Sequence, residues 1–380
     1  MKRDTRLIHS GRPRLEDDLV NAPVRRASTV IAPSTEELYN PTPPRRHYGR
    51  GGLSPNWELR DAIAGLYGAD HVALAPSGLA SVVLAIRAAV EGPGEALITD
   101  SVYGPVRKFC DEELPRLGLS VRYYDPRTGA GIADLLSSNT RLVHLESPGS
   151  LTFEVQDVPA IAAAARKAGA KTVIDDTWTA GLLMNPLEMG VDYAAQALTK
   201  YVGGHSDFLM GAVAARGDTA EELQARERLY GGHVSPDDAF LALRGLRTLA
   251  LRLERSGASG LALARKLEAH PKIARVLHPA LETSPDHALF VRDFSGSAGC
   301  FSVVLNAIGP RGGEAFAEAL SLFGIGFSWG GFESLVLPCD RQIKRTATRW
   351  SAEGALVRFS IGLEDPDDLW ADIEQALERV

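Results

Sequence analysis

The sequence has few of the residues that define several common protein classes. Its 380 residues include three cysteines, Cys110, Cys300 and Cys339, which are too few and too widely spaced for a disulfide framework or a zinc module. No apolar run reaches the ~18 residues that span a bilayer. The charged N-terminus leads into no apolar segment, so it is unlike a secretory signal. We therefore expect a soluble, cytoplasmic protein without membrane association.

Positive charge is not in excess either. The chain has 41 Lys and Arg against 48 Asp and Glu, which gives a formal net charge of −7, whereas a general nucleic-acid binder carries a basic excess. Hydrophobic residues make up 45% and charged residues 23%, a balance that is typical of globular proteins and excludes disorder over most of the chain. We expect a folded protein that binds no nucleic acid, and the length predicts two or more domains.

Three segments of the chain differ in pattern. Residues 1–55 are rich in proline and arginine and lack sustained periodicity. Their apolar and aromatic side chains favour an arm ordered by a neighbouring subunit over a disordered tail. Residues 56–246 alternate short apolar runs with helical stretches, which predicts right-handed crossovers and a mostly parallel sheet. Residues 247–380 predict a smaller C-terminal α+β domain, so the predicted fold class is α/β.

Several helix starts are marked by local signals. Ser77-Gly78 opens a helix with an apolar stripe, and Asp157 is followed by a proline in the first turn. Ser235 precedes a proline and two acids, which together form a strong helix start. The helical stretch after Ser235 is predicted to break at Gly257 or Gly260.

Three features fall at a helix start or at the carboxyl end of a predicted strand, where open parallel sheets bind ligands. The turn at Ser77 presents free backbone N–H groups that favour an anion such as phosphate. Asp175 ends an apolar strand, where a carboxylate needs a cation or hydrogen-bond donors. Lys200 ends another apolar segment, where its pKa can fall enough for it to act as a nucleophile or Schiff-base former.

Each of these features alone has an ordinary explanation. Short Ser-Gly helix starts are common, Asp175 could be a capping acid, and Lys200 could be a surface lysine. His205 and Asp207 offer too few ligands for a metal, so no metal site is expected. The turn at Ser77 has the spacing of neither a dinucleotide fingerprint, a P-loop nor a nucleophile elbow. Taken together, however, a lysine, an acid and a phosphate cradle describe a site for pyridoxal 5′-phosphate (PLP).

A series of sequence blocks strengthens this interpretation. The blocks lie, in order, at residues 5–11, 47–50, 77–81, 146–148, 173–177, 199–207, 328–334 and 358–364. They resemble those of the Cys/Met-metabolism family of PLP-dependent enzymes, the γ-subfamily of fold type I, over almost the whole chain. Within that family, residues 146–150, 176–178 and 328–334 are most similar to the bacterial cystathionine β-lyases.

The resemblance implies roles for individual residues. Lys200 would carry the cofactor as a Schiff base and then act as base and acid, Asp175 would pair with the pyridinium nitrogen, and Tyr103 would stack on the ring. The residues implied to bind the cofactor are Tyr48, Arg50, Gly78, Leu79, Tyr103, Asp175, Thr199 and Lys200, with Tyr48 and Arg50 coming from a neighbouring subunit. The residues implied to bind the substrate are Tyr48, Tyr103, Ser328, Trp329 and Arg358, with Arg358 clamping the α-carboxylate.

The implied activity is that of a PLP-dependent carbon–sulfur lyase of methionine biosynthesis, which converts L-cystathionine to L-homocysteine, pyruvate and ammonia. The implied assembly is a homotetramer built from two dimers whose subunits share active sites. Other chemistries on the same scaffold remain open: cystathionine γ-synthase, cystathionine γ-lyase and methionine γ-lyase. A noncatalytic binding protein is a further alternative, although pure binding needs no lysine such as Lys200.

Four positions depart from the family pattern. Ala197 stands where many members have a phosphate-binding serine, and Asp176 stands where asparagine is more common. Phe327 replaces an expected tyrosine, and Gly51 replaces a residue that is often basic. The first two departures bear on the cofactor and the last two on the substrate.

Overall fold

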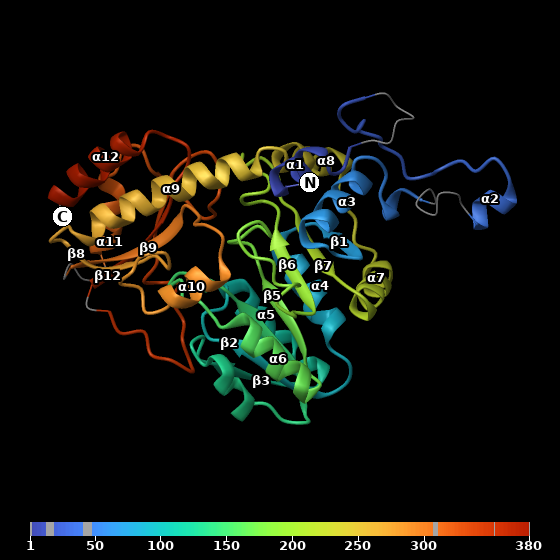
Figure 1. Ribbon diagram of the computed structural model, residues 1–380, viewed down its shortest axis with the longest axis horizontal. Helices are drawn as coiled ribbons and strands as arrows, with labels where there is room; N and C mark the ends of the chain where they lie inside the picture. Colours follow the sequence, from blue (N-terminus) through green and yellow to red (C-terminus); the bar gives the residue numbers. More distant parts are fainter. Residues whose placement is uncertain (1, 13–18, 41–47, 307–310, 353, 380) are drawn as a thin grey trace.

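The computed structural model describes residues 2–12, 19–40, 48–306, 311–352 and 354–379 (Figure 1). The larger part of the chain contains the strands β1 (His71–Ala75), β2 (Gly94–Thr99), β3 (Leu119–Tyr124), β4 (Thr140–Glu146), β5 (Lys171–Asp175), β6 (Tyr193–Ala197) and β7 (Gly211–Ala215). Its α-helices are α1 (Arg3–His9), α2 (Thr35–Tyr39), α3 (Asn56–Tyr67), α4 (Gly78–Ala89), α5 (Gly104–Glu113), α6 (Val158–Ala168), α7 (Asp218–Tyr230) and α8 (Pro236–Leu246).

The C-terminal part contains the helices α9 (Leu249–Glu268), α10 (His287–Asp293), α11 (Gly312–Ala319) and α12 (Pro366–Glu378). Its strands are β8 (Ile273–Leu277), β9 (Cys300–Asn306), β10 (Gly324–Ile325), β11 (Leu335–Pro338) and β12 (Gly354–Ser360). No helix within the described residues is both long enough and apolar enough to span a membrane.

The seven strands of the larger part form one sheet with the order β1-β7-β6-β5-β4-β2-β3. All neighbouring strands from β6 to β3 run parallel, and β7 is antiparallel to both β1 and β6. The predicted mostly parallel sheet is therefore confirmed. This arrangement brings the carboxyl ends of β4, β5 and β6 to the same edge.

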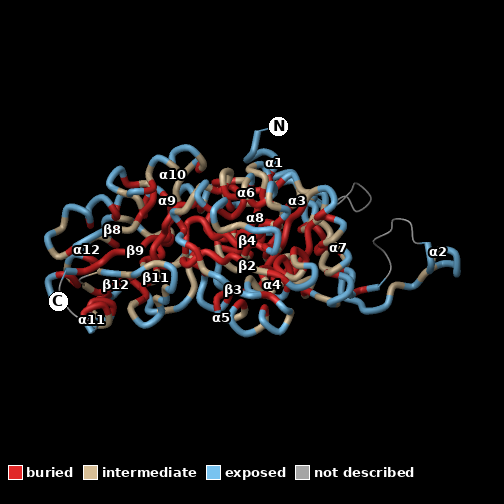
Figure 2. The backbone as a smooth tube through the Cα atoms, turned by 90° about the horizontal axis from the view of Figure 1, so that it is seen from below, coloured by how far each residue is buried: buried red, intermediate tan, exposed pale blue. Residues whose placement is uncertain are grey.

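Both faces of this sheet are buried (Figure 2). Along β4, Leu142 joins one hydrophobic cluster while Val143 and Leu145 join the other, because successive side chains of a strand point to opposite faces. Helices α4, α5 and α7 cover the first face, and α3, α6 and α8 cover the second. Burial on both faces explains why these strands read as continuous apolar runs in the sequence.

The predicted helix starts are confirmed by side-chain caps. The Ser77 hydroxyl accepts a hydrogen bond from the Ala80 N–H at 3.1 Å at the start of α4. Asp157 accepts from the Ala160 N–H at 3.3 Å at the start of α6, and Ser235 caps α8. These bonds satisfy backbone donors that have no partner within the helix.

The predicted break at Gly257 or Gly260 is wrong. Helix α9 continues through both glycines, and the interruption falls earlier, between Leu246 and Leu249. A Cβ atom on Gly257 would lie 2.1 Å from the carbonyl oxygen of Ser297. The glycines therefore let α9 pack closely on the segment before β9, and this packing outweighs their low helix propensity.

The C-terminal strands form a second sheet with the order β10-β11-β12-β9-β8. Only the short β10–β11 pair among its neighbours is parallel. Apolar residues of α9, α11 and α12 cover the sheet. This is the smaller sheet-containing unit that the sequence predicts.

The N-terminal region contains two helices that the sequence pattern does not predict. In the first, α1, Leu7 is buried, and the Arg247 guanidinium donates hydrogen bonds to the carbonyls of Leu7 at 3.3 Å and Ile8 at 2.6 Å. This helix thus packs on its own chain. In contrast, α2 buries none of its residues and extends away from the body of the protein (Figure 1). Domain boundaries at residues 55 and 246 stay a prediction.

Candidate active site

A cavity of about 450 Å³ opens between the two sheets at the carboxyl ends of β4, β5 and β6. It brings together most of the residues that the sequence implies for a site. Those lining it are Gly78, Leu79, Tyr103, Asp175, Thr199, Lys200, Ser328, Trp329 and Arg358. Their positions in the cavity are observed, and their individual roles stay predictions.

Lys200 follows β6 and points across the cavity toward the C-terminal part. Its Nζ donates a hydrogen bond to the Ser328 hydroxyl at 2.6 Å and lies 5.6 Å from the centre of the Trp329 ring. Burial and then the nearby positive charge of Arg358 lower the pKa of Lys200 to about 8. A substantial fraction of the amine is therefore neutral near physiological pH, which is the form that acts as a nucleophile or base.

Asp175 lies at the end of β5, where Thr177 fixes its orientation. One carboxylate oxygen of Asp175 accepts hydrogen bonds from the Thr177 N–H at 3.0 Å and the Thr177 hydroxyl at 2.5 Å. Burial raises the pKa of Asp175, and the Thr177 hydrogen bonds and the charge of Lys200 oppose this. A cationic group beside the carboxylate would offset the cost of its burial.

The N-terminus of α4 forms the cradle of the cavity. A Cβ atom on Gly78 would lie 2.4 Å from the Cβ of Ala197, so the close approach of α4 to β6 requires glycine at position 78. The first turn of α4 presents the positive end of a helix dipole to the cavity. The nearby Thr199 hydroxyl donates to the Met210 carbonyl at 3.2 Å and accepts from the Met210 N–H at 3.0 Å, so its donor is already used.

Arg358 on β12 brings a cation from the C-terminal sheet. It donates a hydrogen bond through Nη2 to the Ser328 carbonyl at 2.7 Å. Its Nε is buried and has no hydrogen-bond partner among the residues that the structure describes. A buried N–H without a partner is costly, and a ligand carboxylate in the cavity would satisfy it.

Tyr103 stands at the N-cap position of α5 without a side-chain capping bond, and it is held through its backbone. Its N–H donates to a Glu146 carboxylate oxygen at 2.7 Å, while its side chain remains half exposed in the cavity. Burial, and then the charges of Asp175 and Glu146, raise the pKa of the Tyr103 phenol. The ring is thus available as an aromatic wall.

Among the cavity-lining residues to which the sequence assigns no individual role are Glu146, Cys300 and Gln342. Glu146 ends β4 and pairs in register with Asp175 on β5. Burial and the charge of Asp175 raise its pKa well above the ordinary value. A carboxylate at the end of a buried parallel strand is the signal that identified Asp175, and it could have identified Glu146 as well.

Tyr48 and Arg50 do not reach this cavity in their own chain. They line a separate surface hollow of about 500 Å³, together with Ser28 and His233. The Arg50 guanidinium lies 6.0 Å from the centre of the Tyr48 ring. Their predicted role therefore requires a second subunit and stays a prediction.

The departures from the family pattern occupy different environments. Asp176 is fully buried and accepts hydrogen bonds from the Tyr67 hydroxyl at 2.7 Å and the Gly181 N–H at 3.0 Å. Its burial raises its pKa to about 7. Phe327 lies at the rim of the cavity with 77% of its surface exposed. A Cβ atom on Gly51 would meet no atom of a described residue within 4 Å.

The donor set fits pyridoxal phosphate. The cavity offers an amine with a lowered pKa, a half-buried carboxylate with a raised pKa, a helix N-terminus and a guanidinium N–H that no described residue pairs. The chain matches the protein family described as "Cys/Met metabolism PLP-dependent enzyme" over residues 4–378. The chain belongs to this family.

Relatives of the chain match it along its full length. A protein of Rhizobium johnstonii, named provisionally as a cystathionine beta-lyase, is 46% identical over 98% of this chain and 95% of its own. The cystathionine beta-lyase MetC of Escherichia coli K12 is 40% identical over 100% of this chain and 99% of its own. The crystal structure of metB from Corynebacterium glutamicum superposes with a TM-score of 0.91 at 29% identity, over 99% of this chain and 97% of that one.

Proposed function

We propose that this chain is a cystathionine β-lyase, which uses PLP to convert L-cystathionine to L-homocysteine, pyruvate and ammonia. The observation that carries the proposal is the convergence of Lys200, Asp175 and Arg358 on one cavity. Relatives named for this reaction are similar to the chain over nearly its whole length, which favours this reaction over the other chemistries of the family.

Each of these residues has a separate role in the proposed reaction. When bound, the cofactor supplies an electron sink for negative charge at the substrate Cα. Arg358 pairs with the substrate α-carboxylate and uses the Nε that no described residue accepts from. Asp175 would hold a proton at the ring nitrogen of the cofactor. Lys200 takes the Cα proton at Nζ, with the Ser328 hydroxyl as its hydrogen-bond partner.

The position of the bond that breaks distinguishes β- from γ-elimination. Loss of sulfur from the carbon next to Cα requires one proton abstraction, which the single amine of Lys200 can perform. The γ chemistry requires a second abstraction at Cβ. Both routes remain compatible with the residues of the cavity, so the products decide between them.

We also propose a cytoplasmic homotetramer in which each site is shared between two subunits. Among the described residues that line the cavity, the cations are Lys200 and Arg358, and both are assigned to other tasks. A phosphate group would gain a cation from the neighbouring subunit's Tyr48–Arg50 segment. The apolar rim residues Leu209 and Phe327, which are 66% and 77% exposed, would be covered by that subunit.

Product identification tests the function. The PLP-loaded protein is incubated with L-cystathionine, and pyruvate with homocysteine is the expected result. Products of 2-oxobutyrate and cysteine would assign the chain to the γ-lyases, and no cleavage would favour the synthase or binding alternatives. Lys200→Ala should abolish turnover, whereas Lys108→Ala, at a lysine whose side chain is 75% exposed, serves as the matched control.

A further inference from the structure

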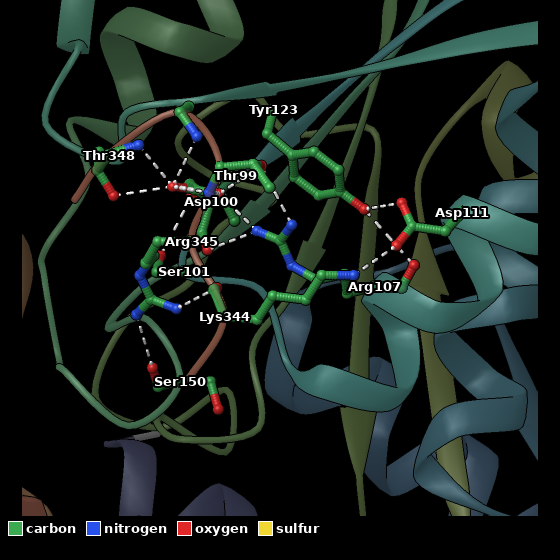
Figure 3. Close-up of polar contacts among 12 residues, drawn as sticks. Thr99, Asp100, Ser101, Arg107, Asp111, Tyr123, Ser150, Lys344, Arg345 and Thr348 are labelled. Atoms are coloured by element: carbon green, nitrogen blue, oxygen red, sulfur yellow. Dashed lines mark hydrogen bonds and ion pairs between the residues drawn. The ribbon is translucent and has the colours of Figure 1, made fainter. Parts of the chain in front are cut away.

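Asp100, which directly follows β2, is a fully buried carboxylate outside the set of residues discussed above. It accepts hydrogen bonds from three consecutive backbone N–H groups: Thr346 at 2.9 Å, Ala347 at 3.0 Å and Thr348 at 2.7 Å. The hydroxyls of Thr346 and Thr348 add bonds of 3.1 and 2.8 Å. A carboxylate of the large sheet therefore holds a loop that belongs to the C-terminal sheet (Figure 3).

We call residues 340–348, which lie between β11 and β12, the strap. Arg107 of α5 also donates to the Asp100 carboxylate, and its guanidinium lies 3.7 Å from the centre of the Tyr123 ring. The Tyr123 hydroxyl donates to Asp111 at 2.6 Å, and Asp111 pairs with Lys344 of the strap at 3.3 Å. The contacts thus close a ring from Asp100 through α5 and back to the strap (Figure 3).

The other side of the strap lies against the wall of the cavity. Arg345 donates to the Thr152 hydroxyl at 2.5 Å, next to the wall residue Leu151. Ile343 packs against the hydrophobic cluster that contains Leu151. Between these contacts and β11, Gln342 lines the cavity and is exposed.

The same set of contacts, from Asp100 through α5 to the strap, also holds the turn that contains Tyr103. Asp100 and Arg107 flank Tyr103 in the chain, and the Arg107 N–H donates to the Tyr103 carbonyl at 3.0 Å. Asp100 thus fixes two walls of one cavity, the Tyr103 turn and the strap. Burial alone would raise the pKa of Asp100, but the hydrogen bonds from Thr346, Thr348 and Arg107 lower it, so the carboxylate is ionised at neutral pH and its bonds are charge-assisted.

We propose that Asp100 is a positioning residue whose hold on the strap places Gln342 against the part of the substrate beyond its sulfur atom. This inference rests on the proposed function, because a thioether substrate has such a part. A primary amide both donates and accepts hydrogen bonds, so Gln342 suits the second amino-acid group of L-cystathionine. A substrate that ends just after sulfur gains nothing from this contact.

Two substrates of the same β-elimination test the inference in the PLP-loaded protein. L-Cystathionine carries a second amino-acid group beyond sulfur, and S-methyl-L-cysteine carries only a methyl group. Gln342→Ala and Thr348→Val should raise the KM for L-cystathionine by roughly 3- to 10-fold, the effect of about one lost hydrogen bond. The kcat for L-cystathionine and both constants for S-methyl-L-cysteine should stay within about twofold. Arg341→Ala is the matched control, since Arg341 belongs to the strap but pairs with Glu314 at the surface.

Hydrogen exchange supplies a measurement that does not depend on turnover. In Asp100→Asn, the amides of residues 346–348 should exchange faster than in the wild-type protein, because an amide side chain is a weaker acceptor for three N–H groups. If Asp100→Asn does not fold, amide exchange is measured in Thr348→Val instead, where the amides of Thr346 and Ala347 should exchange faster.

Two results would overturn the positioning role. One is an equal loss with both substrates in Gln342→Ala and Thr348→Val, and the other is unchanged exchange in a folded Asp100 variant. Failure of the wild-type protein to cleave L-cystathionine would instead overturn the proposed function, and the exchange measurement would still decide whether Asp100 holds the strap.

Discussion

The amine of Lys200 donates a 2.6 Å hydrogen bond to the hydroxyl of Ser328, which lies 128 positions further along the chain. Lys200 follows a strand of the large sheet, and Ser328 precedes a strand of the C-terminal sheet. Ser328 has a φ of +83°, a conformation that residues with a side chain seldom adopt. The contact joins the two sheets at the atom assigned to proton transfer.

The Ser328 contact predicts a defined loss of rate. Ser328→Ala removes the hydrogen-bond partner of the Lys200 amine, so kcat should fall by roughly 10-fold, the effect of one hydrogen bond to a charged group. Ser328→Gly loses the same hydroxyl but accommodates the positive φ. Steady-state kinetics of both variants should show similar losses. Full activity in Ser328→Gly would mean that kcat depends on the backbone conformation at position 328 and not on the hydroxyl.

The sequence predicts those features of this protein that are encoded by residues close together in the chain. Lys200 and Asp175 are candidates because ligands bind at strand ends in parallel sheets, and the caps at Ser77 and Asp157 are encoded within four residues. The link from Asp100 to Thr348 spans 248 positions and leaves no local signal. The break predicted at Gly257 or Gly260 is wrong for the same reason, because the packing of α9 on the segment before β9 depends on tertiary structure.

The lowered pKa of Lys200 predicts a pH dependence of cofactor uptake. The neutral amine attacks the aldehyde of PLP, and its fraction grows as the pH rises through about 8. The rate of PLP uptake by the cofactor-free protein should therefore rise by about tenfold per pH unit below that value and level off above it. Stopped-flow absorbance measures this rate, and Lys200→Ala is the control. A plateau that begins only near pH 10 would contradict the lowered pKa.

Asp176 predicts a pH-dependent effect on stability. Its folded-state pKa of about 7 lies above the ordinary value of 3.8, so the folded state binds a proton that the unfolded state releases. The contribution to stability is therefore full below about pH 4 and is lost as the pH rises through 7. Asp176→Asn keeps a neutral side chain, so it should melt at a higher temperature than the wild-type protein at pH 8. Thermal unfolding should show the difference shrinking at pH 5, and a constant difference would exclude the titration of Asp176 as its source.

The last prediction concerns the sharing of sites between subunits. In Arg50→Ala the site keeps Lys200 but receives a defective arm, and in Lys200→Ala the arm is intact but the site has no amine. After the two inactive proteins are mixed and their subunits are exchanged in mild denaturant, a dimer with one subunit of each kind should contain one complete site. Random exchange makes about half of the dimers mixed, so about a quarter of all sites should recover.

The control for this experiment is a mixture of Lys200→Ala with the double variant Arg50→Ala/Lys200→Ala, which contains no complete site under any exchange. An arm that served its own chain would also leave the first mixture inactive, because every amine-bearing site would then keep the defective arm. Recovery in the first mixture alone therefore requires that Arg50 of one subunit complete the site of another. This is consistent with the placement of Tyr48 and Arg50 in a hollow separate from the cavity of Lys200.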